Sequence, residues 1–174
     1  MAILSIKTFG DPVLRERARD VETFDASLAR LAEDMVETMH EAPGVGLAAP
    51  QVGRSIRLIV FDVGEGPTAL VNPALSGHEG EQTGEEGCLS IPGLYFPVTR
   101  AMKVTCDAVD VRGEPIHLEG EELLARVFQH EVDHLDGVLF VDKLQGEERK
   151  QALAAIRDQA LGLVEATPDP SRAL

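Results

Sequence analysis

The sequence predicts an α+β domain in which mostly antiparallel sheets surround a central helix, with further helices flanking it near the N- and C-terminal ends. Short runs of branched aliphatic residues, which are typical of strands, recur through the first two-thirds of the chain. Apolar residues at three- and four-residue spacing indicate helices near both ends and a third at about residues 121–135. That third segment contains a His-Glu-x-x-His pattern, so we expect the central helix to carry the chemistry.

Composition narrows the class of protein. Hydrophobic residues make up 44% and charged residues 26% of the 174 residues, as in an ordinary soluble globular protein. The net charge of −14 argues against broad nucleic-acid binding, so no DNA partner is expected. No apolar run approaches the roughly 18 residues that cross a membrane, and Met1 to Leu14 lacks a signal pattern. With only two cysteines, we expect a cytoplasmic protein without a membrane partner.

The N-terminal part is expected to contain one long helix. Ile3 to Lys7 is a short apolar run, predicted as an edge strand or an extended segment. The helical pattern from Asp25 to Glu41 has an aspartate suited to cap its first turn, and Pro43-Gly44 ends it.

The middle of the chain is expected to supply the strands. Residues 76–87 contain four glycines and four glutamates, which predicts an exposed acidic loop. A turn at Gly113-Glu114-Pro115 would lead into the last strand of a hairpin. The predicted strands are Ile56 to Asp62, Ala69 to Pro73, Val98 to Val104, Ala108 to Val111 and Ile116 to Leu118.

Two helices are predicted to follow the strands. The first runs from about Glu121 to Leu135, and Gly137 is well placed to stop it. The second runs from about Glu147 to Val164. We expect one domain over residues 1–165 and a flexible tail over residues 166–174, where two prolines interrupt any periodicity. The inward face of the first helix is predicted to hold Leu123, Leu124, Val127, His130 and His134.

The spacing of His130 and His134 has a direct chemical meaning. Residues four apart lie one turn apart on the same side of a helix, so both imidazoles can bind one metal ion, while Glu131 can act as a base. A third ligand is needed. The candidates are Cys88 in a glycine-flanked loop, Cys106 in a strand pattern, and downstream carboxylates such as Glu147 and Glu148. Cys88 with the two histidines would leave a fourth position open, as in catalytic sites.

Three stretches in this order resemble the bacterial peptide deformylase family. The resemblance covers about residues 3 to 145, and residues 93–97 are similar to the actinobacterial version. The three stretches are Gly44-Val45-Gly46-Leu47-Ala48-Ala49-Pro50-Gln51, Glu86-Gly87-Cys88-Leu89-Ser90 and Gln129-His130-Glu131-Val132-Asp133-His134-Leu135-Asp136-Gly137.

The resemblance implies a metallohydrolase that removes the formyl group from the N-terminal formyl-methionine of new polypeptides and releases formate. It implies that Cys88, His130 and His134 bind the metal and that Glu131 transfers the proton. The Gln51 side-chain amide and the Leu89 backbone N–H would stabilise the developing negative charge.

Substrate binding follows from the same resemblance. The peptide would lie as an added strand beside Gly44, Val45 and Gly46, and its methionine would enter a pocket lined by Val45, Leu123, Val127 and the His130 ring. Three residues keep open roles. Arg126 would either extend outward or line the pocket mouth, Tyr95 stands where an arginine often contacts substrate, and Arg100 would be either a support near Cys88 or a surface residue.

The identity of the metal ion and the function of the site each have more than one candidate. Ligand type alone favours Zn²⁺, whereas the resemblance implies Fe²⁺, with Zn²⁺, Ni²⁺ or Co²⁺ as substitutes. The rival functions are a His-Glu-x-x-His metallopeptidase and a non-catalytic metal-binding domain. The expected partners are N-formylmethionyl nascent peptides. Transient ribosome contact through Arg149, Lys150 and Arg157 is a further hypothesis, which the acidic total counts against.

Overall fold

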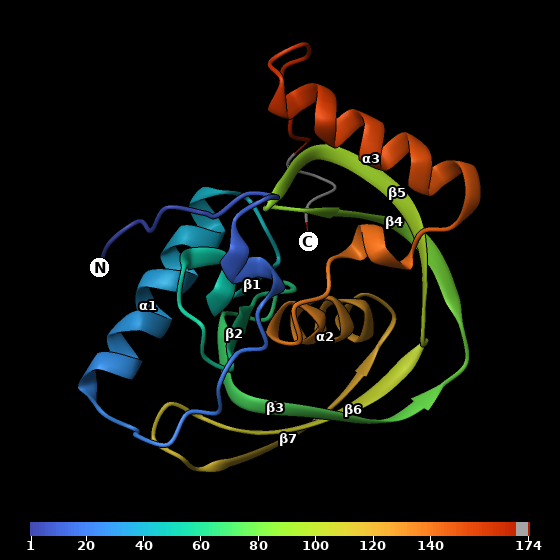
Figure 1. The fold of residues 1–174 in the computed structure, drawn as a ribbon. Helices are drawn as coiled ribbons and strands as arrows, with labels where there is room; N and C mark the ends of the chain where they lie inside the picture. The colour runs from blue at the N-terminus through green and yellow to red at the C-terminus, as the bar shows by residue number, and fades with distance from the viewer. Residues whose placement is uncertain (170–173) are drawn as a thin grey trace.

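The computed structural model describes residues 1–169 and Leu174 (Figure 1). Three α-helices and seven strands are joined by short 3₁₀ turns at Pro12–Arg15, Ala49–Val52 and Phe140–Lys143. The helices are α1 (Ala26–Glu41), α2 (Glu122–Leu135) and α3 (Gly146–Ala160), and the strands are β1 (Gly46–Ala48), β2 (Leu58–Phe61), β3 (Thr68–Glu79), β4 (Gln82–Cys88), β5 (Ile91–Arg100), β6 (Lys103–Val109) and β7 (Pro115–Glu121).

Five strands form one antiparallel sheet in the order β1-β2-β3-β6-β7. Strand β2 is buried along its whole length because both faces of the sheet are covered there. Leu58 and Val60 belong to a core cluster with the apolar face of α1, whereas Ile59 and Phe61 belong to a second cluster with α2. The alternation of a strand therefore places α1 and α2 on opposite faces of this sheet.

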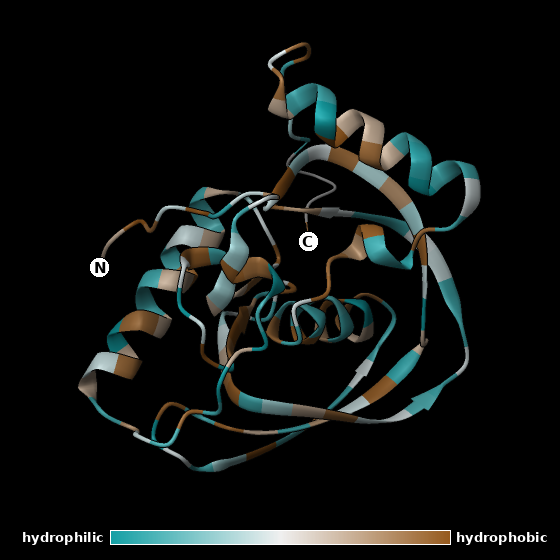
Figure 2. Cartoon of the chain, in the orientation of Figure 1, coloured by the Kyte–Doolittle hydropathy of each residue, from teal (hydrophilic) through white to brown (hydrophobic). Residues whose placement is uncertain are grey.

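Strands β4 and β5 pair with each other as a separate two-stranded sheet. Figure 1 shows α2 running through the middle of the molecule, with the large sheet on one side and this hairpin on the other. Helix α3 lies against β5 on the outside, and only Ala152 and Ile156 of that helix are buried. In Figure 2 the ribbon of α3 alternates between teal, hydrophilic segments and paler or brown ones.

The predicted α+β class with antiparallel sheets around a central helix is confirmed, and α1 and α2 closely match their predicted ranges. The Asp25 side chain accepts hydrogen bonds from Ser27 N and Leu28 N, as its predicted role as a helix cap requires. Helix α3 ends at Ala160, which is earlier than the predicted Val164.

Two predictions about the strand region are wrong. Residues 76–87 are not a loop: most of them lie in β3 and β4, and Gly80, at positive φ, lies in the short turn between these strands. Of the two alternatives predicted for residues 3–7, the structure shows the extended segment and not the edge strand, with Lys7 N donating to Gln51 O. The stretch from Val98 to Val104 is interrupted by a turn at residues 101–102.

The inward face of α2 is confirmed except at its start. Leu123 is 46% exposed, whereas Val127, His130 and His134 are buried, so deep burial begins only after the first turn of the helix. Residues 161–169 have no helix or strand. The flexible tail predicted for residues 166–174 stays a prediction, and its residues 170–173 lie outside the described residues. Within the described residues, no helix is both long enough and apolar enough to span a membrane.

Candidate metal centre and active site

Cys88, His130 and His134 meet in the interior, between the end of β4 and the middle of α2. One donor atom from each lies within 4.8 Å of the others, and His134 Nε2 is 3.3 Å from Cys88 Sγ. Ligands arranged tetrahedrally around one ion at normal bond lengths are about 3.3–3.6 Å apart. His130 Nε2 is buried without a hydrogen-bond partner among the described residues, as a metal-facing nitrogen would be. The donor set therefore fits a divalent metal ion.

The helix and the hairpin position these ligands for simple geometric reasons. One helical turn separates the two histidines, and their ring centroids are 5.0 Å apart. The His130 ring also stacks on Phe140, which follows α2 in the chain. Cys88 is the last residue of β4, just before the turn into β5. The Cys88 thiol therefore faces α2, where its Sγ lies 3.3 Å from His134 Nε2.

Glu86 connects the metal ligands to two arginines. Its Oε1 lies 2.8 Å from His130 Nδ1 and accepts a hydrogen bond from Arg100, and its Oε2 accepts from both Arg100 and Arg126. Burial alone would raise the pKa of Glu86, but the hydrogen bonds from Arg100 and His130 hold it well below its usual value. A fixed carboxylate at Nδ1 orients the ring so that Nε2 faces the other ligands.

The sequence does not single out Glu86, because it lies in the stretch predicted as an exposed acidic loop. Two signals could have found it: its place two residues before Cys88, and its position in a strand where alternate residues face inward. Together they would place Glu86 on the same face as Cys88 and the exposed Glu85 on the opposite face.

The open roles of the two arginines are now resolved. Arg126 neither extends outward nor lines the pocket mouth: it is buried and donates to Glu86 and to the Val98 carbonyl. Gly84 makes room for it, because a Cβ on Gly84 would lie 3.3 Å from Arg126 Nη2. Arg100 is also buried and joins Glu86 to Asp133, so it is a support near Cys88 and not a surface residue.

Glu131 is fully buried next to the metal ligands. Neither of its carboxylate oxygens has a hydrogen-bond partner among the described residues. Burial raises the pKa of Glu131 to about 7, although the nearby His130 acts in the opposite direction. A buried carboxylate that titrates near neutrality can both accept and return a proton.

Gln51 is buried at the end of the glycine-rich stretch and is fixed in orientation. Its Oε1 accepts a hydrogen bond from Ala48 N at 2.9 Å, so its amide Nε2 points the other way. That nitrogen donates to Ser90 Oγ at 3.2 Å and lies 3.6 Å from Cys88 Sγ. Leu89 lies between these two residues in the turn after β4. The structure thus brings Gln51 and Leu89 to the metal ligands.

The glycines of this stretch allow a close approach between backbone and site. Gly44 lies so near Leu89 that a Cβ would come within 2.8 Å of its side chain. A Cβ on Gly46, the first residue of β1, would collide with the Glu131 carboxylate. Strand β1 pairs with β2 on one side and forms one edge of the five-stranded sheet. The edge strand therefore runs directly beside the candidate base.

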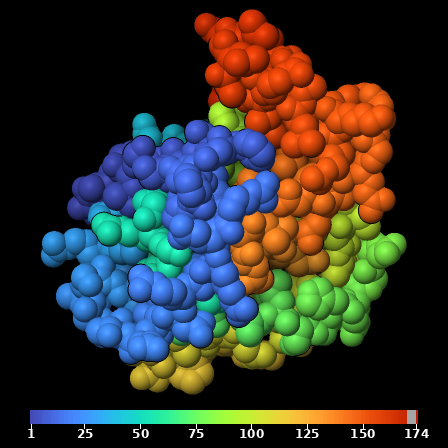
Figure 3. All heavy atoms as spheres, viewed as in Figure 1, coloured from blue at the N-terminus to red at the C-terminus, as the bar shows by residue number. Residues whose placement is uncertain are grey.

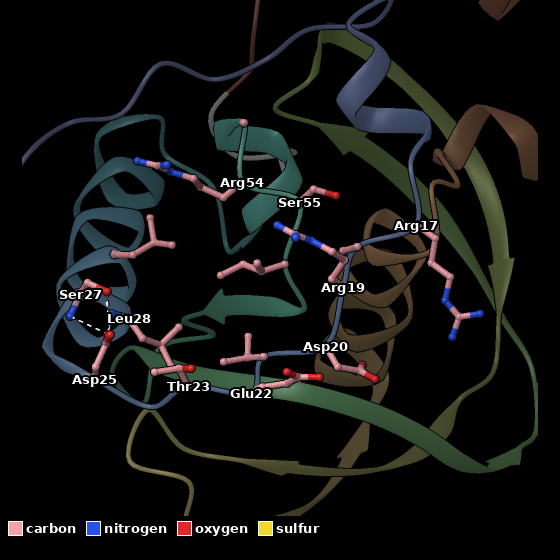
Figure 4. A pocket seen from close by; sticks show the side chains of 15 residues that line it. Arg17, Arg19, Asp20, Glu22, Thr23, Asp25, Ser27, Leu28, Arg54 and Ser55 are labelled. Atoms are coloured by element: carbon pink, nitrogen blue, oxygen red, sulfur yellow. Dashed lines mark hydrogen bonds between the residues drawn. The ribbon is translucent and has the colours of Figure 1, made fainter.

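A cavity of about 370 Å³ adjoins this centre and includes Cys88, Leu89 and Tyr95 in its lining. Of the predicted pocket residues, Val127 is completely buried, Val45 is half-buried and Leu123 is exposed. A larger groove of about 1210 Å³ lies elsewhere, between the segment after Arg17 and the start of α1 (Figure 4). None of the candidate catalytic residues lines that groove, and its charges are of mixed sign.

The other proposed third ligands lie outside the centre. Cys106 is in β6, is completely buried, and has its pKa raised to about 11, chiefly by burial. Glu147 and Glu148 are exposed in the first turn of α3. Among the described residues, only one cluster of three or more His, Cys, Asp or Glu side chains has donor atoms close enough to share an ion.

Comparison with known proteins decides the family. A family model described as polypeptide deformylase matches residues 3–150. The chain belongs to the polypeptide deformylase family. It is 51% identical to the peptide deformylase of Acidothermus cellulolyticus over 176 residues, which is 99% of this chain and 98% of that protein.

Solved structures give the same result. The peptide deformylase of Legionella pneumophila has a TM-score of 0.88 and 45% identity, covering 95% of this chain and 100% of that one. The peptide deformylase of Thermus thermophilus has a TM-score of 0.87 and 48% identity, covering 92% of this chain and 96% of that one. The fold and the enzyme class predicted from the sequence, a peptide deformylase acting on formyl-methionyl polypeptides, are therefore confirmed.

Proposed function

We propose that the centre at Cys88, His130 and His134 carries out this deformylation with Glu131 as the general base. A divalent metal ion held by the three side chains supplies Lewis acidity and an activated water molecule. The observation that carries the proposal is the fully buried Glu131 carboxylate, which has no hydrogen-bond partner among the described residues and lies beside a three-ligand cluster. Burying a carboxylate without a hydrogen-bond partner is costly, and such residues are found preferentially at functional sites.

Glu131 takes a proton from the attacking water and returns it to the amine that leaves. Both transfers require a group whose pKa lies near the working pH, and burial places that of Glu131 at about 7. Gly46 leaves the carboxylate room on the side of β1. The proton can therefore move between water and the substrate amine without a second acid.

Gln51 and Leu89 stabilise the negative charge that develops on the formyl oxygen. The Gln51 amide is already oriented by Ala48, so it donates without reorganising during the reaction. The Leu89 backbone N–H, one residue after Cys88, is the second donor. Loss of one such donor costs about 100- to 1000-fold in rate.

The substrate backbone adds to the free edge of β1, beside Gly44, Val45 and Gly46. Edge strands bind extended peptides through main-chain hydrogen bonds, and small residues keep that edge accessible. The methionine side chain then enters the apolar region of Val45, Leu123 and Val127, next to the His130 ring. Leu123 remains exposed, so it would form the outer part of that pocket.

Fe²⁺ is proposed as the working metal, with Zn²⁺, Ni²⁺ and Co²⁺ as substitutes. The donor set of one thiolate and two imidazoles accepts all four ions. Protein purified without oxygen and reloaded with each ion should show the highest activity with Fe²⁺. Equal activity with Zn²⁺ would reject iron as the preferred metal.

The decisive experiment measures formate release from a formyl-Met peptide by oxygen-free, Fe²⁺-loaded protein. Glu131→Gln should lower kcat about 100-fold or more because a positioned base is lost. Glu148→Gln, at an exposed glutamate of α3, should leave the rate unchanged. A folded, metal-loaded Glu131→Gln protein with normal kcat would refute the proposed base.

The rival functions find less support. A metallopeptidase using this helix would leave the Gln51 contacts with the Cys88 loop without a purpose. A purely structural site would need a fourth protein ligand, and the cluster among the described residues has three. Cleavage of an unformylated peptide without formate release would favour the peptidase.

We place the reaction in the cytoplasm, on nascent chains, and retain a transient ribosome contact as a proposal. Both cysteines are free, which suits a reducing compartment. On α3, Lys150 and Arg157 are exposed and lie near Glu147 and Asp158. Reversing both charges with Lys150→Glu and Arg157→Glu should weaken co-sedimentation with ribosomes, and unchanged co-sedimentation would reject the contact.

A further inference from the structure

Residues 161–169 lead from α3 back to β5, and Leu174 lies in the interior of the molecule. The end of α3 and the turn after it project outward in Figure 3, and Leu161 and Leu163 are 65% and 69% exposed there. Leu174, in contrast, is only 6% exposed. In the view of Figure 1 the label of the C-terminus stands between β4 and α2. A leucine at this end of the chain is therefore buried, although the leucines just after α3 are not.

Two contacts hold the returning segment on β5. Tyr95 Oη accepts a hydrogen bond from Asp169 N at 2.5 Å and lies 3.1 Å from Asp169 O. Gly93, at φ +78°, lies so close to Thr167 that a Cβ would come within 2.8 Å of its backbone nitrogen. A side chain at position 93 would push the segment away. The sequence Gly93-Leu94-Tyr95 therefore provides both the space and the hydrogen-bonding group for it.

The segment forms part of the wall of the cavity at the metal centre. Pro168 and Asp169 line the cavity of about 370 Å³ together with Cys88, Leu89 and Tyr95. Cys88 is a metal ligand, and Leu89 carries the proposed oxyanion donor. The segment thus shares one cavity with Cys88 and Leu89.

Leu174 belongs to the buried apolar cluster that includes Val127 and Phe128 of α2, against which Val45 also packs. Val45 and Val127 are the residues proposed to receive the first side chain of the substrate. Leucine and methionine are apolar side chains of similar size, so one pocket accepts either. The cluster therefore already contains a side chain of the kind that the substrate would insert.

We propose that the groove for the peptide substrate is a docking surface for the end of this same chain. Thr167 to Asp169 lie along β5, and Leu174 occupies the pocket for the first side chain of the substrate. Substrate must displace this segment, which makes it a built-in competitive inhibitor. This inference rests on the proposed function of the groove.

The first test compares full-length variants in the formate assay. Leu174→Asp removes the apolar anchor, so KM for a formyl-Met peptide should fall about three- to tenfold if the groove is closed in about 70–90% of molecules, with kcat unchanged. Leu163→Asp, at an exposed leucine of the same region, should leave both constants as they are. An unchanged KM in Leu174→Asp would overturn the proposal. A raised KM would also overturn it, because the segment would then help to bind substrate.

The second test does not depend on activity. A synthetic peptide with the sequence of residues 166–174 should bind the Leu174→Asp protein in calorimetry and compete with substrate in the assay. The same peptide carrying Asp at its last position should do neither. Absence of binding overturns the docking proposal even where formate release is normal, whereas binding without any formate release overturns the proposed function alone.

The same assay separates docking within one chain from docking between copies. Docking within one chain predicts a KM that is independent of protein concentration, because the effective concentration of the segment is fixed by its linkage. A KM that rises with protein concentration would overturn the intramolecular arrangement.

Discussion

Helix α2 is buried equally deeply on two sides, but for different physical reasons. Towards the five-stranded sheet, Phe128 packs edge-on against Phe61 of β2, with ring centroids 5.3 Å apart. Towards the β4–β5 hairpin, Arg126 and His130 meet Glu86 through hydrogen bonds and charge. The first side gains stability from apolar area removed from water. The second avoids a large loss only because each buried charge has a partner. The depth at which a side chain is buried therefore does not reveal how it contributes to the stability of the fold.

The largest effect is expected on the charged side. Glu86→Ala would leave Arg100 and Arg126 buried without their shared anion, at a cost of about 3–5 kcal/mol in the free energy of unfolding. Because His130 loses its orienting partner, metal affinity should also fall about 10- to 100-fold. Urea unfolding of the metal-free protein and competition against a chelator measure the two effects. Glu81→Ala, at an exposed glutamate just before β4, is the control. Unchanged metal affinity in Glu86→Ala would remove Glu86 from the metal centre.

A smaller loss should follow from Arg126→Met. Methionine fills similar space, and Glu86 keeps Arg100 and His130, so we expect about 1.5–3 kcal/mol from the lost charged hydrogen bonds. The Val98 carbonyl also loses its donor. Urea unfolding again measures the change. A variant as stable as the parent would show that apolar packing replaces this ion pair at no cost, and the contrast between the two sides of α2 would weaken.

The apolar side should respond more mildly to a conservative change. Phe128→Leu removes the aromatic pair with Phe61 and part of the ring volume, which costs about 1–2 kcal/mol. Metal affinity should not change, since no ligand touches this pair. Thermal unfolding and chelator competition, run in parallel with the Glu86 variants, test both statements. A drop in metal affinity would mean that the two sides of the helix are coupled.

The smallest effect concerns the second cysteine. Burial raises the pKa of Cys106 to about 11, so its reactive thiolate is scarce at pH 8 and becomes about tenfold more abundant with each pH unit up to that value. In a Cys88→Ser protein, alkylation of Cys106 followed by mass spectrometry should be very slow at pH 8 and accelerate as pH rises. Rapid labelling of the folded protein at pH 8 would show that β6 opens to solvent.

The sequence alone predicts the apolar side of this contrast and the three candidate metal ligands that the structure brings together, but not the supporting charges. The spacing of apolar residues located α2, and the His-Glu-x-x-His pattern located the two histidines. Glu86, however, lies in a stretch predicted as a loop, and its inward position follows only once that stretch is known to be a strand. Arg126 has the same difficulty, because its burial depends on Gly84, which lies on a distant strand. Pairing between distant segments is a property of the folded chain.

The metal centre also has a consequence for chain entropy. Cys88 and His134 are 46 residues apart, and strands β5, β6 and β7 lie between them. An ion bound to both side chains closes that loop, as a disulfide would. In the loop-length treatment of cross-links, a closure of this size restricts the denatured chain by about 4 kcal/mol. The ion proposed for the reaction would thus also act as a reversible cross-link. Its removal would restore the lost conformational entropy of the unfolded chain.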